Sequence, residues 1–218
     1  MEEIKVKYKI LLPKIGKDLE TLFFNKNNIQ DNDSFCDGIM EGCIIENQKA
    51  EHVSFDQIIF RNVIFKNIDF EFIELTDVRF EHCDLSNANL SAAVIHRVEI
   101  ISCKILGLNL SEATLRNVLF DDCNGRYISL RFADLKQVNF NNCLFQNGDF
   151  QKTNFSKIGF FNLNLQQAEF SGTSLKDIDL TSCTIDGINA RIENLNGVIV
   201  SLIQAASLSR IMGIVIKT

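Results

Sequence analysis

The sequence contains a single proline, Pro13, and no tryptophan. Because proline lacks a backbone donor and is excluded from central strands and helix interiors, the chain after Pro13 keeps its backbone donors throughout. No apolar run approaches the roughly 18 residues of a membrane helix. The first residues alternate charged and apolar side chains, unlike the basic start and apolar block of a signal peptide. We therefore expect a cytoplasmic protein with no membrane association.

An excess of positive charge is also lacking. The 22 Lys and Arg residues face 28 Asp and Glu residues, which gives a net charge of −6 and a pI of about 5.1. A basic surface is the electrostatic signature of nucleic-acid binding, so direct nucleic-acid binding is not expected. The acidic charge is uneven, because residues 31–100 carry 14 acidic and 5 basic side chains, whereas residues 101–218 carry 10 and 11.

The usual chemical motifs are missing as well. The chain has no C-x-x-C pair, no glycine-rich phosphate loop and no nucleophile elbow. Its three histidines, His52, His82 and His96, fall at positions expected to face solvent and form no triad or ligand pattern. We expect no catalytic residue, no metal and no cofactor, and hence a protein that is not an enzyme.

The sequence does contain a regular repeat, in which a large apolar residue recurs at every fifth position. Of the 33 positions at multiples of five from Phe35 to Leu195, 30 are Leu, Phe, Ile or Met, and the exceptions are Ala50, Gly125 and Ala190. Neither a helix (3.6 residues) nor a strand (2.0 residues) has this period, so a repeated backbone unit must produce it. At Gly125 we expect either a tolerated packing gap, filled by Phe120, Phe145 or Tyr127, or a bend.

A second period of 20 residues lies inside the first. The residue two before the central position repeats in type every four units, and one such series is rich in cysteine. This indicates a coil of four sides with like residues stacked, and about eight coils of roughly 4.8 Å each. Small buried thiols explain the series better than a metal ladder, which would lack ligands for tetrahedral zinc. Cys36 is the one cysteine expected to face outward. The members of the series are Cys43, Cys83, Cys103, Cys123, Cys143 and Cys183.

Units such as Cys83-Asp84-Leu85-Ser86-Asn87 and Ala133-Asp134-Leu135-Lys136-Gln137 resemble the A(D/N)LXX unit of pentapeptide-repeat proteins. The resemblance covers about residues 33–198. It implies an all-β fold, a right-handed quadrilateral β-helix whose axis is filled by the central Leu or Phe.

The two ends lie outside the repeat. We expect residues 1–32 to cap the first coil, with a strand over Ile4–Ile10 and a short helical turn within Ile15–Phe24, residues 33–200 to form the β-helix, and residues 201–218 to form a C-terminal helix and a short strand. Ser201 and Gln204 fit a capping box, Gly213 suits the helix end, and residues 214–216 read as the strand. Because this helix is so apolar, we expect it either to fold back on the last coil or to pair with a second copy of the chain. The residues expected to form a homodimer are Leu202, Ile203, Ala206, Ile211, Met212 and Ile214.

The sequence Asn196-Gly197-Val198-Ile199-Val200, followed by a helix and by Met212-Gly213-Ile214, resembles the tail of the quinolone-resistance (Qnr) and microcin-immunity proteins. This resemblance implies a C-terminal dimer that binds DNA gyrase or topoisomerase IV as a mimic of duplex DNA and relieves poisoning by a drug or toxin. Many Qnr proteins interrupt the five-residue phase with inserted loops, and here the phase is unbroken.

Mimicry of DNA requires organised negative charge, so the acidic residues of the early coils are the candidate partner-binding site. The alternative is a scaffold that binds another protein through the side faces of the rod, where outward apolar residues such as Ile44, Ile64 and Leu119 lie. An N-terminal segment packed over the early coils would also explain Ile44 and Ile64. The candidate acidic residues are Glu41, Glu46, Glu51, Asp69, Glu71, Glu74, Asp77 and Glu81.

Overall fold

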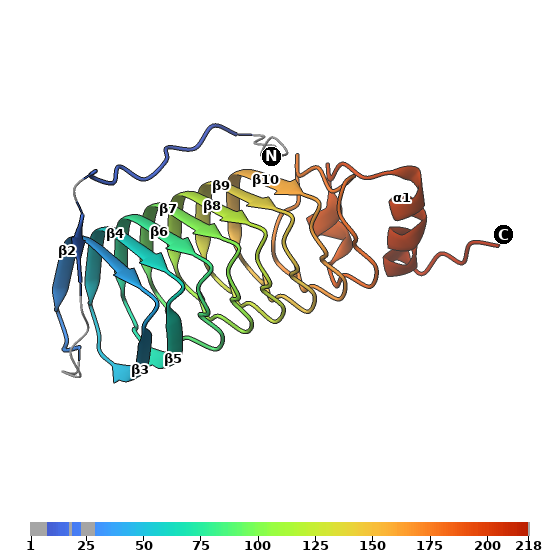
Figure 1. Cartoon of the computed structure of the whole chain (residues 1–218). Helices are drawn as coiled ribbons and strands as arrows, with labels where there is room; N and C mark the ends of the chain where they lie inside the picture. Colours follow the sequence, from blue (N-terminus) through green and yellow to red (C-terminus); the bar gives the residue numbers. More distant parts are fainter. Residues whose placement is uncertain (1–7, 18, 23–28, 218) are drawn as a thin grey trace.

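The computed structural model describes residues 8–17, 19–22 and 29–217. Along one side of the rod, strands of eight residues begin every 20 residues from β2 to β10 and pair in parallel, drawn as the row of stacked arrows in Figure 1. The two-residue strand β1 adds to the start of this sheet. The order of this sheet is β1-β2-β4-β6-β7-β8-β9-β10. Its strands are β1 (Glu20–Thr21), β2 (Ser34–Glu41), β4 (Ser54–Arg61), β6 (Glu74–Glu81), β7 (Val94–Ile101), β8 (Thr114–Asp121), β9 (Asp134–Asn141) and β10 (Asn154–Phe161).

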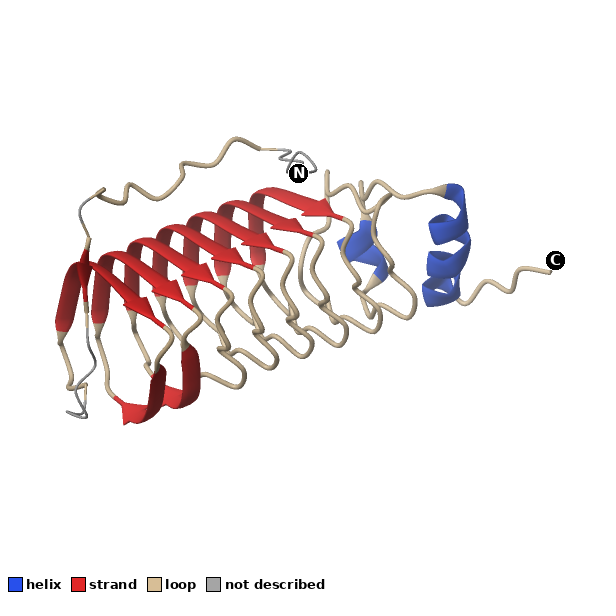
Figure 2. Ribbon diagram, in the orientation of Figure 1, coloured by secondary structure: helices blue, strands red, loops and turns tan. Residues whose placement is uncertain are grey.

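A second, shorter sheet lies on another side of the coil and pairs β3 (Ile44–Lys49) with β5 (Ile64–Asp69). Beyond β5 this ladder continues as isolated parallel bridges, from Ile64↔Asp84 to Asn164↔Thr184. Each of these pairs joins residues 20 apart, so one coil contains four pentapeptides, as the sequence predicts. The fold is a β-solenoid of about seven turns with one short C-terminal α-helix (Figure 2), which confirms the predicted fold class.

Left-handed residues turn the chain at the corners. From Asn32 to Asp177, the second residue after each central position adopts positive φ, as at Asn62 (φ 53°), Asn67 (φ 53°) and Asn87 (φ 58°). Asparagine tolerates this conformation better than most residues, and the outward positions are accordingly rich in it. A left-handed residue every five positions therefore bends the extended chain into a polygonal coil.

The central residues fill the axis. Phenylalanine rings stack from one coil to the next, with centroid distances of 4.9 Å between Phe60 and Phe80 and 5.0 Å between Phe120 and Phe140. Gly125 leaves no gap, because a Cβ at this position would lie 2.4 Å from the Phe145 ring. Phe145 thus takes the space, as one of the predicted alternatives has it, while Tyr127 is 61% exposed.

The N-terminal segment differs from the prediction. The described residues of Ile15–Phe24 contain no helical turn; they contain β1, which pairs with β2. The predicted strand over Ile4–Ile10 falls largely outside the described residues, and residues 8–10 form no strand. The segment also does more than cover the first coil: residues 8–14 run across the outer face of β6–β9 (Figure 1). Their partners are 63 to 131 residues away in sequence, so no local pattern could place them.

The C-terminal segment begins with a 3-10 turn, η1 (Ile192–Leu195), followed by α1 (Leu202–Leu208) and η2 (Ser209–Met212). Ser201 caps α1 through a capping box with Gln204, and Gly213 ends η2 at φ 74°, both as predicted. The predicted strand over residues 214–216 is wrong. The Ile214 N–H donates to Ser209 O at 3.1 Å and closes the helix end, and no strand of the described residues lies beside residues 215–217.

Candidate functional site

The interior of the early coils is filled by its own side chains. The space among Phe55, Phe60, Phe80 and their neighbours is about 10 Å³, no more than a single water requires. Within the described ranges, no group of three or more His, Cys, Asp or Glu side chains is placed to hold a metal ion.

The cysteine series is part of this packing. Cys83, Cys103, Cys123, Cys143 and Cys183 are buried, and Cys43 is half-buried. The Cys83 N–H donates to the Cys103 sulfur at 3.3 Å, and that thiol donates to Ile101 O at 3.2 Å. The hydrogen bond with Cys83, together with burial, raises the pKa of Cys103, so this thiol stays protonated and unreactive.

The candidates for chemistry at the surface are not activated either. Cys36 is exposed, as predicted, but a hydrogen bond with Asp37 and the charge of that carboxylate raise the pKa of its thiol. His52 and His82 are exposed, and His96 is half-buried beside Arg97. Burial and the positive charge of Arg97 lower the pKa of His96.

Five of the eight candidate acidic residues form ion pairs with a cation one coil away. Arg61 lies between Glu41 and Glu81, at 3.7 and 2.7 Å. These pairs form because the parallel register places residue i directly beside residue i + 20, and opposite charges at that spacing must meet. The remaining three pairs are Lys49–Asp69 (2.7 Å), Lys66–Glu46 (3.2 Å) and Arg97–Asp77 (2.6 Å).

The three other candidates, Glu51, Glu71 and Glu74, lie near one corner of the early coils. Glu51 and Glu71 stack above Asp31, whose carboxylate accepts the Glu51 N–H at 2.8 Å, and Glu71 accepts a hydrogen bond from the Asn89 amide. Within the part of the chain that the structure describes, none of these four carboxylates has an ion-pair partner. We call Asp31, Glu51, Glu71 and Glu74 the acidic corner.

An aromatic pair that the sequence analysis did not single out adjoins the acidic corner. His52 and Phe72 stack with centroids 4.9 Å apart, and Phe72 is 41% exposed. Phe72 has a φ of 59°, a left-handed conformation that is costly for a bulky side chain. The sequence alone could have identified Phe72 as unusual, because it stands at a corner position where Asn, Gly and Asp are common.

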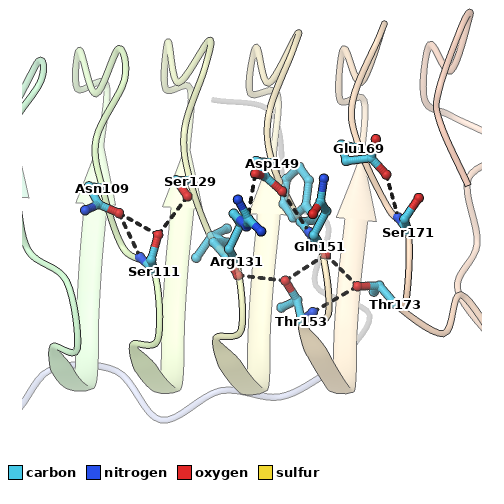
Figure 3. A network of polar contacts seen from close by, with 12 residues as sticks. Asn109, Ser111, Ser129, Arg131, Asp149, Gln151, Thr153, Glu169, Ser171 and Thr173 are labelled. Carbon is cyan, nitrogen blue, oxygen red and sulfur yellow. Dashed lines mark hydrogen bonds and ion pairs between the residues drawn. The ribbon is translucent and has the colours of Figure 1, made fainter.

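A similar aromatic residue occurs three coils further on. Phe132 (φ 57°) is 46% exposed and lies under two cations, with Arg131 5.4 Å and Lys152 5.2 Å from the ring centroid. The same side of the rod carries a ladder of polar contacts, shown in Figure 3, in which the hydroxyl of Thr153 donates to Leu130 O at 2.7 Å. The polar side chains of this ladder find hydrogen-bond partners within it, so we interpret the ladder as structural.

The C-terminal end presents the most exposed apolar surface. Leu202 is 89% exposed and Ile203 84%. The helix is nonetheless fixed to the coil: Leu208 is buried, and the Gln204 amide donates to Leu180 O (2.7 Å) and Cys183 O (2.8 Å). Gln204 thereby satisfies carbonyl groups at the open end of the solenoid.

Five of the six residues expected to form a dimer are exposed at this end. Ile211 is the exception, because it packs against the core. Val215 and Ile216, which the prediction did not include as dimer residues, extend the exposed apolar surface, and a groove of about 480 Å³ lies between them and α1. We call the following residues the C-terminal apolar surface: Leu202, Ile203, Ala206, Met212, Ile214, Val215 and Ile216.

No helix of the described residues has the length and apolar character needed to cross a membrane. The described surface therefore contains two candidate protein-interaction sites, the acidic corner near one end of the rod and the C-terminal apolar surface at the other.

The chain is similar to proteins of known structure and to one protein family. Residues 73–147 match the model of the pentapeptide repeat region, and no curated protein sequence matches the chain. A trypsin-treated variant of QnrB1, described as a plasmid-mediated fluoroquinolone resistance protein, is 15% identical over 88% of this chain and 100% of its own, with a TM-score of 0.37. Full-length QnrB1 is 18% identical over 83% of this chain and 100% of its own, with a TM-score of 0.32.

HetL, a pentapeptide repeat protein involved in heterocyst differentiation regulation in the cyanobacterium Nostoc sp. strain PCC 7120, is 14% identical over 79% of this chain and 88% of its own, with a TM-score of 0.23. The assignment rests on the family match and on the 20-residue parallel register that the structure shows directly. The resemblance seen in the sequence is thus confirmed, and residues 73–147 are a pentapeptide repeat region.

Proposed function

We propose that this chain is a non-enzymatic binding protein that docks on DNA gyrase or topoisomerase IV and protects the enzyme from quinolones or related poisons. The observation that carries the proposal is the acidic corner, where no carboxylate forms an ion pair among the described residues, although Lys49, which pairs with Asp69, contributes positive charge nearby. A topoisomerase holds DNA on a basic surface. An acidic rod edge would compete for that surface, and its binding would weaken as salt increases.

The pattern of ion pairs supports a smaller contact surface than the eight candidate acidic residues together. Glu41, Glu46, Asp69, Asp77 and Glu81 are paired with cations and contribute little net field. Glu51 and Glu71 are one coil apart, about 4.8 Å, and repeat negative charge along the rod edge. The stacked His52 and Phe72 beside them supply the kind of aromatic surface that is enriched at protein interfaces. We therefore propose the acidic corner, and not the early coils as a whole, as the partner-binding site.

The proposed assembly is a homodimer through the C-terminal apolar surface. Side chains as exposed as Leu202 and Ile203 are uncommon as a contiguous patch on a monomer. A twofold pairing of α1 would bury them and place the two acidic corners at opposite outer ends of a longer rod. Light scattering at micromolar concentration tests this proposal, and a monomeric mass would contradict it.

A gyrase supercoiling assay with ciprofloxacin tests the function. We expect the wild-type protein to restore supercoiling and to bind purified gyrase. The double variant Glu51→Lys/Glu71→Lys should lose both effects, whereas the matched control Glu46→Lys, on another side of the coil, should retain them. Absence of rescue at any concentration of the wild-type protein, together with absence of gyrase binding, would sink the proposal.

A second candidate function is a scaffold that binds another protein through a side face. It is favoured by Ile44 and Ile64, which pair across β3 and β5 and are 59% and 44% exposed. A pull-down with the full chain should then recover a partner other than a topoisomerase, and Ile64→Asp should abolish its capture. Retention of the partner by Ile64→Asp would argue against this face.

A further inference from the structure

The N-terminal segment crosses the rod in an extended conformation, on the outer face of the long sheet. It starts at β9, where the Asn139 amide donates to Tyr8 O at 2.9 Å and the Gln137 amide donates to Lys9 O at 3.1 Å. It passes β8, where the Leu11 N–H donates to Asn117 Oδ1 at 3.1 Å. It reaches β6, where the Lys14 N–H donates to Asp77 Oδ1 at 2.8 Å. We call residues 8–14 the strap; Figure 1 shows it as the dark blue segment along the arrows.

All four hydrogen bonds join a main-chain atom of the strap to a side chain of the coil. Asparagine and glutamine side chains carry both a donor and an acceptor, so they can bind the N–H and C=O groups of any extended segment. Side chains of β6, β8 and β9 therefore recognise the course of the strap and place few demands on its sequence.

The face under the strap is built for such a segment. Asp77, Glu99, Asn117 and Asn139 point outward from the sheet, yet each is at most 8% exposed. Asn139 Oδ1 is buried without a hydrogen-bond partner among the described residues. The neighbouring Gly159 makes room for this amide, because a Cβ there would lie 2.3 Å from Asn139 Oδ1. Buried polar groups that are not fully paired are costly, which favours a face that holds a main chain.

One strap side chain adds selectivity. Ile10 is 9% exposed, whereas the next two residues, Leu11 and Leu12, are 52% and 56% exposed. Leu119 of β8, an outward position of the coil, is 3% exposed on the same face. A segment bound here thus needs one large apolar side chain at the position of Ile10, while its neighbours face solvent.

We propose that the outer face of β6–β9 is a binding groove for an extended peptide segment of a partner protein, and that the strap occupies this groove in cis. The partner segment carries one large apolar residue and is held by its main chain through Asn117, Gln137 and Asn139. Because the strap belongs to the same chain, it competes at a high effective concentration. The groove is therefore closed until the strap is displaced. This inference does not depend on topoisomerase binding.

The test uses the full chain with the strap loosened. The variant Ile10→Asp places a charge where the apolar side chain is buried, and we expect trypsin cleavage after Lys9 and Lys14 to accelerate at least tenfold. A fluorescein-labelled peptide with the sequence of residues 8–14 should then bind Ile10→Asp at least tenfold more tightly than wild type, measured by anisotropy. The matched control Leu11→Asp, at an exposed strap position, should change neither cleavage nor peptide binding.

A second substitution separates main-chain recognition from a general opening of the fold. Adding Asn117→Ala to Ile10→Asp should weaken peptide binding about fivefold or more, with the circular dichroism spectrum unchanged. A peptide in which the isoleucine is replaced by aspartate should not bind. Unchanged trypsin cleavage of Ile10→Asp would show that the strap cannot be displaced, and a released strap without peptide binding would show that the groove accepts only its own tethered segment. Either result overturns the proposal.

Discussion

The two segments outside the repeat, the strap and α1, pack against the coil in different ways. The strap lies along the side of the rod and covers outward groups of three strands, whereas α1 docks on the last coil and leaves its own apolar residues uncovered. Ile10 of the strap is 9% exposed and Ile203 of α1 is 84% exposed. Isoleucine is found in both places, so the difference comes from what each segment packs against. The strap completes a surface within one chain, and α1 presents a surface that a second chain would complete.

If the strap and α1 only add to a coil that is stable without them, the largest loss of stability should follow a substitution in the coil itself. Phe140 is fully buried, stacked on Phe120 at 5.0 Å and edge-on to Phe145 at 5.4 Å. We expect Phe140→Ala to lower the free energy of unfolding by about 3–5 kcal/mol, measured by urea denaturation. A loss below about 1 kcal/mol would show that the aromatic stack does not dominate the core.

The next effect concerns assembly. Ile203→Asp puts a charge at the centre of the C-terminal apolar surface, and we expect the mass measured by light scattering to fall from dimer to monomer. Because Ile203 is exposed in the single chain, the thermal midpoint of the monomeric coil should change little. Ile64→Asp, a matched change on an early coil, should leave the mass unaltered. A dimeric Ile203→Asp would remove the contrast between the two segments.

A smaller effect is expected under the strap. Burial by itself raises the pKa of Asp77, but hydrogen bonds from Arg97 and from the Lys14 N–H, with the charge of Arg97, outweigh it and hold the pKa below its usual range. We expect Asp77→Asn to cost about 1–3 kcal/mol of stability at pH 7 and to speed cleavage at Lys14.

This stabilisation should depend on pH in a defined direction. A lowered pKa in the folded state contributes stability above the unfolded value of about 3.9 and loses it as the pH falls through the folded value. The difference between wild type and Asp77→Asn, followed by thermal unfolding from pH 7 to pH 3, should therefore shrink at the acidic end. A difference that grows towards pH 3 would contradict this account of the ion pair.

The smallest effect should come from an ion pair that no segment covers. Lys104 and Asp84 are 3.0 Å apart, with 57% and 31% of their side chains exposed. We expect Lys104→Ala to change the free energy of unfolding by no more than about 0.5 kcal/mol. The comparison with Asp77→Asn isolates the contribution of the strap, and equal losses in the two variants would show that covering the pair adds nothing.

The period of five was enough to predict the coil and its core, and the local pattern of Ser201, Gln204 and Gly213 was enough to predict the C-terminal helix, because these depend on residues that repeat or lie close in sequence. The period of 20 could also have predicted the ion pairs, because Lys49–Asp69 and Arg61–Glu81 are opposite charges 20 residues apart. Pairs of this kind neutralise five of the eight candidate acidic residues. Phe72 and Phe132 could likewise have been noticed as bulky residues at left-handed corners.

The strap could not have been predicted in the same way. Its residues contact Asp77, Asn117 and Asn139, each in a different coil and none at a repeating offset from the strap. Apart from Leu119, the residues of β6–β9 that receive it are polar and outward, and in the sequence these polar residues look like ordinary solvent-facing positions. Only the three-dimensional course of residues 8–14 shows that this face is covered.

The strap also sets an upper limit on the length of the rod in one region. A solenoid gains or loses whole coils when 20-residue blocks are duplicated or deleted, and the coil itself places no limit on how many. The strap does, because Tyr8 and Lys14 are tied to Asn139 and Asp77, three coils apart. Three coils span about 14 Å and four about 19 Å, whereas seven fully extended residues reach at most about 23–25 Å. The strap can therefore accommodate one further coil between β6 and β9, but a second would bring it to the limit of its reach, so it sets an upper bound on the number of coils between its two anchors.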